Sequence, residues 1–141
     1  MFTELILAGV IVAVCVMIHV SGLMMLAEQL TKRVRTERVN SLVTDIGSMI
    51  VVFGIIVLLH AAETAVWAVF YQTWQLFPNF ETSLYFSLTT YTAIGFGDVV
   101  LPEKWRLLGG VEGISGLLLC GLSTAFLFLI ISTFQQNRHK E

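Results

Sequence analysis

Three long apolar stretches constrain the fold of this chain more than any other feature. They cover residues 5–27, 46–71 and 107–134, and as helices each would cross the roughly 30 Å hydrocarbon core of a bilayer. The chain is 56% hydrophobic and only 13% charged, which lies outside the usual composition of soluble domains. The sequence therefore predicts an all-α integral membrane protein with three transmembrane helices, the first of them within residues 1–27.

The basic residues predict the orientation of these helices, because cytoplasmic segments carry an excess of Lys and Arg. Six of the eight lie in a connector at residues 28–45 or in a tail at residues 135–141, namely Lys32, Arg33, Arg35, Arg38, Arg138 and Lys140. We therefore expect an external N-terminus, a cytoplasmic connector and tail, and a location in the plasma (inner) membrane. The connector itself is either a short amphipathic helix along the headgroups or a solvated loop.

The segment between the second and third stretches contains a helix too short to cross the membrane. Residues 81–92 follow the turn signal Pro78-Asn79 and would form about 18 Å of helix. The glycine-punctuated residues 93–98 come next. Non-helical backbone at bilayer depth must be buried in protein or line a water-filled path. The spacing therefore predicts a re-entrant helix over 81–92 followed by a loop at 93–98.

This loop resembles the pore signature of potassium channels, usually written Thr-Val-Gly-Tyr-Gly-Asp. Gly95, Gly97 and Asp98 take the positions of the two glycines and the aspartate, and Ile94 and Phe96 those of the valine and the tyrosine. The chain departs from the signature at Ala93, which stands where the family has a threonine. In the family that threonine hydroxyl helps to form the innermost ion site.

The resemblance implies a tetrameric potassium-channel pore domain at residues 46–134. Its parts would be an outer helix (46–71), a pore helix (81–92), a selectivity filter (93–98) and an inner helix (107–134), so the first helix is an addition. One chain supplies carbonyls on one side of an axis only, so identical copies must surround the ion. Potassium would bind the backbone carbonyls of Ala93, Ile94, Gly95 and Phe96, in a filter that also includes Thr92, Gly97 and Asp98.

Ionisable groups within the membrane usually turn inward toward a partner. His60 and Glu63 are three residues apart on one face of the second helix, and we predict that they support the filter from behind, together with Thr89 and Thr90. In the alternative, Glu63 reaches interfacial water. The expected partners of Glu112 are His60, hydroxyls of the pore helix such as those of Thr89 or Thr90, or Arg106 of a neighbouring subunit. These ionisable groups suggest a weak pH sensitivity.

Small residues in the last helix point to gating and to the inner cavity. By resemblance, Gly116 falls where the family keeps a hinge glycine, and Thr124 and Ala125 fall along the cavity. A glycine permits bending because it has no side chain and high backbone freedom.

We therefore predict a homotetrameric, potassium-selective channel that conducts passively in the lipid bilayer, with a weakly selective monovalent cation channel as the alternative. We expect no enzymatic activity and no cofactor other than the permeant ions. The chain has no basic face for nucleic acid and implies no soluble partner. A membrane haem protein with His19 and His60 as axial ligands is a remote alternative, and a non-conducting subunit of a larger channel is another. The chain has neither a serine nucleophile motif nor a zinc-binding pattern, which argues against an intramembrane hydrolase.

Overall fold

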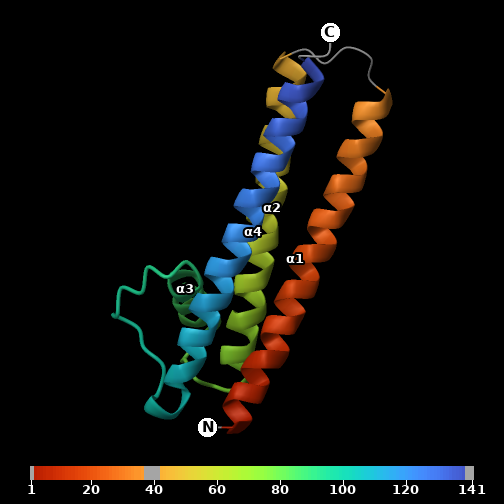
Figure 1. The fold of residues 1–141 in the computed structure, drawn as a ribbon. Coiled ribbons are helices and arrows are strands. Elements are labelled where there is room, and N and C mark those ends of the chain that lie inside the picture. Colours follow the sequence, from red (N-terminus) through yellow and green to blue (C-terminus); the bar gives the residue numbers. More distant parts are fainter. Residues whose placement is uncertain (1, 37–41, 139–141) are drawn as a thin grey trace.

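A computed structural model describes residues 2–36 and 42–138 as a helical bundle (Figure 1). Its elements are α1 (Phe2–Thr36), α2 (Leu42–Thr73), α3 (Phe80–Tyr91), the short 3-10 helix η1 (Glu103–Trp105) and α4 (Arg106–Arg138). The three long helices run side by side, and the short α3 lies against one half of the bundle, toward the end that holds the N-terminus. The loop that follows α3 projects away from the bundle before the chain returns to α4.

Three helices in the described ranges are long and apolar enough to cross a membrane. They cover Phe2–Lys32, Leu42–Thr73 and Glu103–Gln136. This finding confirms the prediction of three spanning helices, and the chain is a multi-pass membrane protein.

The helices extend beyond the apolar stretches that predicted them. α1 continues to Thr36, past the expected end at residue 27, and α2 already begins at Leu42. Glu28 and Lys32 form an ion pair of 2.7 Å one turn apart, and such residues favour a helix in water as well. Much of the expected connector therefore belongs to the two long helices, while residues 37–41 and 139–141 lie outside the described residues.

Helix α3 begins and ends close to the predicted limits of the pore helix. The side chain of Asn79 caps its first turn by accepting a hydrogen bond from the Thr82 N–H at 2.8 Å. At the other end the N–H of Thr92 donates to the Leu88 carbonyl, and the helix stops at Tyr91. The helix thus ends directly before the glycine-rich loop.

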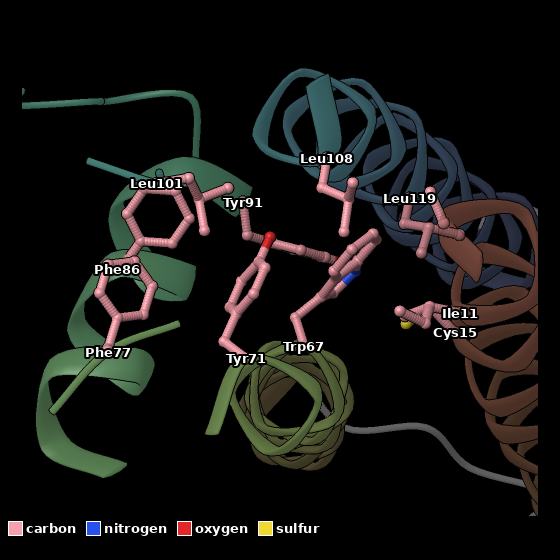
Figure 2. Close-up of a cluster of buried hydrophobic side chains, with 11 residues drawn as sticks. Ile11, Cys15, Trp67, Tyr71, Phe77, Phe86, Tyr91, Leu101, Leu108 and Leu119 are labelled. Atoms are coloured by element: carbon pink, nitrogen blue, oxygen red, sulfur yellow. The ribbon is translucent and has the colours of Figure 1, made fainter. Parts of the chain in front are cut away.

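A core of aromatic and aliphatic side chains holds α3 against α2 and α4 and extends to α1 (Figure 2). Trp67 and Tyr71 of α2 are fully buried in it, and Tyr91 of α3 is 1% exposed. Ile11 and Cys15 bring α1 into the same cluster, and Leu108 and Leu119 bring α4. A second cluster joins α1, α2 and α4 at the other end of the bundle. The additional helix α1 therefore shares its hydrophobic core with the short helix that carries the loop.

Candidate ion pathway and its polar support

The backbone of the loop after α3 alternates its handedness. φ is +58° at Ala93, +53° at Gly95 and +79° at Gly97, whereas Ile94 and Phe96 between them do not have a positive φ. Such an alternation turns successive peptide groups toward the same side of the chain. Glycine reaches a positive φ without a steric penalty, but alanine does so rarely. The loop therefore imposes the same conformation at Ala93 that it has at the two glycines.

Hydrogen bonds at the start of the loop fix the direction of its carbonyls. The N–H groups of residues 93–95 donate to the carbonyl oxygens of Thr89 and Thr90 at 2.9–3.0 Å. In a trans peptide the carbonyl points opposite to the N–H of the same peptide group. The carbonyls of residues 92–94 therefore point away from the end of α3, and Thr89 and Thr90 support the loop through their backbone.

One side of the loop is open in the single chain. All of residues 92–98 are exposed, and the large side chains of Ile94 and Phe96 are 59% and 68% exposed. Two apolar side chains at this exposure in a membrane protein need a cover of lipid or protein. One chain therefore forms one wall of any pathway that runs along these carbonyls.

The far end of the loop is tied back to α3. The Tyr85 hydroxyl donates to Asp98 Oδ2 at 2.7 Å, and this hydrogen bond raises the pKa of the Tyr85 hydroxyl above its ordinary value, because an ionised tyrosine could not donate. Asp98 is exposed in the single chain. The loop is therefore anchored at both ends to the same short helix.

Glu112 of α4 lies behind α3 and is fully buried. Its Oε2 accepts a hydrogen bond of 2.6 Å from the Tyr71 hydroxyl of α2, and its Oε1 accepts one of 2.5 Å from the Ser87 hydroxyl of α3. The structure therefore supplies a pore-helix hydroxyl as the partner, as expected, but from Ser87, because Thr89 Oγ1 donates to the Phe86 carbonyl of its own helix. Glu112 thus joins α2, α3 and α4.

A second buried polar group lies around His60 and Glu63 and includes α1. His19 Nδ1 is 2.8 Å from Glu63 Oε1, and His60 Nδ1 is 3.0 Å from the hydroxyl of Tyr91, which itself donates to Glu63 Oε2. The Nε2 atoms of His19 and His60 lie 3.0 and 3.1 Å from a single atom, Ser123 Oγ. Glu63 is fully buried, so the alternative in which it reaches interfacial water is wrong. These five side chains are called the polar ring below.

The polar ring contains residue types that bind transition metals. His19, His60 and Glu63 each offer one possible ligand atom, and these three atoms lie within 4.8 Å of one another. Each of these side chains is already hydrogen-bonded within the ring, so an ion would have to replace those bonds. A haem does not fit, since the two imidazole centroids are 4.9 Å apart and both Nε2 atoms face one serine hydroxyl, which leaves no room for a macrocycle.

Gly116 packs directly against the last residue of α3. A Cβ atom at this position would lie 2.1 Å from the carbonyl oxygen of Tyr91, a distance that no real contact allows. The same helix face approaches α3 one turn earlier, where a Cβ on Gly113 would lie 3.3 Å from the Thr90 carbonyl oxygen. Gly116 thus allows α4 to pack closely against the end of α3, directly before the loop. This contact is separate from the expected role as a hinge.

The two residues expected along the inner cavity lie farther along α4. Thr124 and Ala125 are both exposed in the single chain, and the Thr124 hydroxyl donates to the Cys120 carbonyl of its own helix at 2.9 Å. Neither residue contacts the polar ring through a hydrogen bond found in the described ranges.

A comparison with protein families shows which family the chain belongs to. Residues 46–133 match a family described as an ion channel, which is more than half of the chain. This protein belongs to that ion channel family. Neither the curated proteins nor the solved structures contain a match. The matched part of the channel includes α3, its loop and nearly all of α4, but it excludes α1.

Five residues that hydrogen-bond to Glu112 or belong to the polar ring were not predicted for this role. They are His19, Tyr71, Ser87, Tyr91 and Ser123. His19 was predicted only as a haem ligand, although its similar depth to His60 is a signal that places it near Glu63. A hydroxyl of Tyr or Ser is common in membrane helices, and nothing in its spacing shows which carboxylate it will meet.

Proposed function

We propose that this channel assembles as a homotetramer and conducts potassium passively through the loop at residues 93–98. The observation that carries the proposal is the alternation of positive φ at Ala93, Gly95 and Gly97 in a loop whose open side is not covered. Rings of backbone carbonyls can replace the water shell of a cation. Four copies around an axis would supply such rings from Ala93, Ile94, Gly95 and Phe96.

The position of α3 supports a cation as the permeant species. The C-terminal end of a helix carries a partial negative charge, and α3 ends at Tyr91, next to the loop. Asp98 adds a carboxylate at the other end of the loop. The orientation that the basic residues favour, with the N-terminus outside, would place Asp98 at the outer mouth and Thr124 and Ala125 on the cytoplasmic side.

In this proposal, Glu112 and the polar ring hold α3 in place, and α3 carries the loop. Glu112 holds the middle of α3 through Ser87, and the polar ring holds its last residue through Tyr91. His60, Glu63 and Glu112 would then act on conduction by fixing α3, without touching the ion. Gly116 would act through its contact with Tyr91.

Ala93 is the position at which potassium selectivity is tested. A hydroxyl at this position would add a ligand at the inner end of each carbonyl row, and its absence favours a weaker innermost site. We expect Ala93→Ser to raise the potassium-to-sodium permeability ratio several-fold over the parent. Serine suits this test better than threonine, because a β-branched residue at φ +58° would add strain.

Bi-ionic reversal potentials of the purified chain in planar bilayers measure this ratio. The parent is expected to prefer potassium, and a ratio near one would instead identify the weakly selective cation channel. A chain that assembles but carries no flux in liposomes would refute the proposal in favour of a non-conducting subunit. Ala62→Ser, an exposed position on α2, is the matched control and should leave the ratio unchanged.

A further inference from the structure

We propose that the polar ring is a binding site for one proton in each chain, and that this proton fastens α1 to the end of α3. The five side chains come from all four helices: His19 from α1, His60 and Glu63 from α2, Tyr91 from α3 and Ser123 from α4. Only the expected effect on conduction rests on the proposed function. The proton site itself follows from the geometry of the ring.

Five hydrogen bonds close the ring. Its links run from Glu63 Oε1 to His19 Nδ1, from His19 Nε2 to Ser123 Oγ, from Ser123 Oγ to His60 Nε2, from His60 Nδ1 to the Tyr91 hydroxyl, and from that hydroxyl to Glu63 Oε2. Each residue takes part in two links, so every imidazole nitrogen and both carboxylate oxygens are engaged. His60 Nδ1 also lies 3.2 Å from Glu63 Oε2, but this nitrogen has at most one hydrogen, which the link to Tyr91 already counts.

The number of hydrogens in the ring supports one added proton. Each of the five links needs one hydrogen between its two heavy atoms. The hydroxyls of Tyr91 and Ser123 supply two, and two neutral imidazoles supply one each, because a neutral imidazole has a donor on one nitrogen and an acceptor on the other. An ionised Glu63 supplies none. The fifth hydrogen is therefore a bound proton, held between Glu63 and His19 or passed around the ring.

The same proton removes a charge from the interior of the bundle. With an ionised Glu63 and two neutral histidines, the ring would carry one negative charge, although His19 and Glu63 are fully buried. The bound proton brings this charge to zero, whether it lies on the carboxylate or forms an imidazolium, and a buried uncompensated charge is expensive in a membrane.

Neighbouring groups do not supply the missing charge or the missing hydrogen. Cys15 of α1 and Cys120 of α4 face the ring, and thiols are neutral near pH 7. The Cys15 thiol lies 4.0 Å from the backbone carbonyl of Glu63, not from its carboxylate. Another buried carboxylate, that of Glu112, accepts hydrogen bonds from Tyr71 and Ser87, so it competes for neither ring histidine.

Loss of the proton would weaken the support of the loop. One of the five links would then join two acceptors, and a buried negative charge would remain. Tyr91 is the last residue of α3, and its carbonyl packs on Gly116. Alkaline pH should therefore loosen both α1 and the base of the loop, and conduction should fall as pH rises.

Glu63→Gln is the decisive variant because glutamine has the shape of a protonated glutamate. Its NH2 group donates to His19 Nδ1 and its oxygen accepts from Tyr91, so five hydrogens are present without a bound proton. In the parent, the folded chain holds a proton that the unfolded chain lacks at about pH 7.5–8.5, so the unfolding equilibrium constant should rise about tenfold per pH unit. In Glu63→Gln this rise should be about tenfold per pH unit smaller than in the parent, because Glu112 and the two cysteines are present in both chains and contribute equally. Glu103→Gln, at an exposed position, should show the same rise as the parent.

Unfolding in mixed micelles gives this comparison without any measurement of conduction. An equal pH dependence in the parent and in Glu63→Gln would overturn the proposal. If Glu63→Gln does not fold, the imidazole nitrogens can be followed by NMR as the pH changes. The chain for this experiment carries His139→Ala, so that His19 and His60 are the two histidines that give signals. Both should shift at one common midpoint, because they share one proton. Two separate midpoints, or a midpoint that moves when EDTA is added, would overturn the assignment, the latter in favour of a bound transition metal.

Discussion

Replacing Gly116 with alanine is expected to destabilise the channel by about 1–3 kcal/mol or more and to abolish conduction. The new Cβ would lie 2.1 Å from the Tyr91 carbonyl oxygen, and its two further neighbours at 2.9 Å also belong to Tyr91. Two of these three atoms are backbone, so no side-chain rotation relieves the clash. Either α4 or the end of α3 must move, and the loop at residues 93–98 moves with it. Thermal unfolding in detergent and ion flux in liposomes measure the two effects.

Gly121→Ala is the matched control for this prediction. Gly121 lies in the same helix, and a Cβ there would meet no atom within 4 Å. Alanine is favoured over glycine inside a helix by about 0.5–1 kcal/mol, so this variant should be slightly more stable than the parent. Gly116→Ala could instead be as stable as Gly121→Ala and change only the opening and closing of the channel. In that case Gly116 acts as a hinge, and its close contact with Tyr91 does not contribute to stability.

Glu112→Ala is expected to lower the free energy of unfolding by about 1–3 kcal/mol or more, and to reduce the yield of folded protein. The carboxylate accepts from two buried hydroxyls, and an alanine leaves them without this acceptor. Ser87 has a second acceptor in the Thr64 carbonyl at 2.9 Å, whereas no second acceptor for Tyr71 is found among the described residues. Most of the loss should therefore come from Tyr71. The unfolding midpoint in mixed micelles checks this.

The pair of Glu112 and Tyr71 provides an internal control. Tyr71→Phe removes the stranded hydroxyl, so its cost in the Glu112→Ala background should be clearly smaller than in the parent. Glu103→Ala, at an exposed position, should change the stability by less than about 0.5 kcal/mol. Additive effects of Tyr71→Phe and Glu112→Ala would show that the hydrogen bond between them contributes nothing.

The lengths of the apolar stretches and the positions of the glycines predicted the helices and the loop, because these elements depend mainly on residues that are close in the sequence. The spanning helices follow from hydrophobic length, and α3 follows from a segment that is too short to span and is preceded by the Asn79 cap. The match to an ion channel family confirms the coarse prediction of an ion channel. Potassium selectivity and the fourfold assembly remain predictions.

The polar contacts were harder to predict because they depend on helix rotation and depth, which sequence spacing does not fix. His60 and Glu63 share a face by their spacing, but Ser123 joins them from a position 60 residues or more away in the sequence. Rotation of α3 decides that Ser87, and not Thr89 or Thr90, meets Glu112. The positive φ of Ala93 was missed for another reason, because composition alone marks only glycines for that conformation.

The uncovered side of the loop has a genetic consequence. If four chains must each contribute one wall of a shared pathway, a subunit that folds and assembles but has a damaged loop spoils every complex it enters. With equal amounts of normal and damaged chains and random mixing, only about one complex in sixteen would be built entirely from normal chains. A defect in residues 93–98 would therefore be dominant in a cell that holds both alleles, whereas a defect that prevents folding would be recessive.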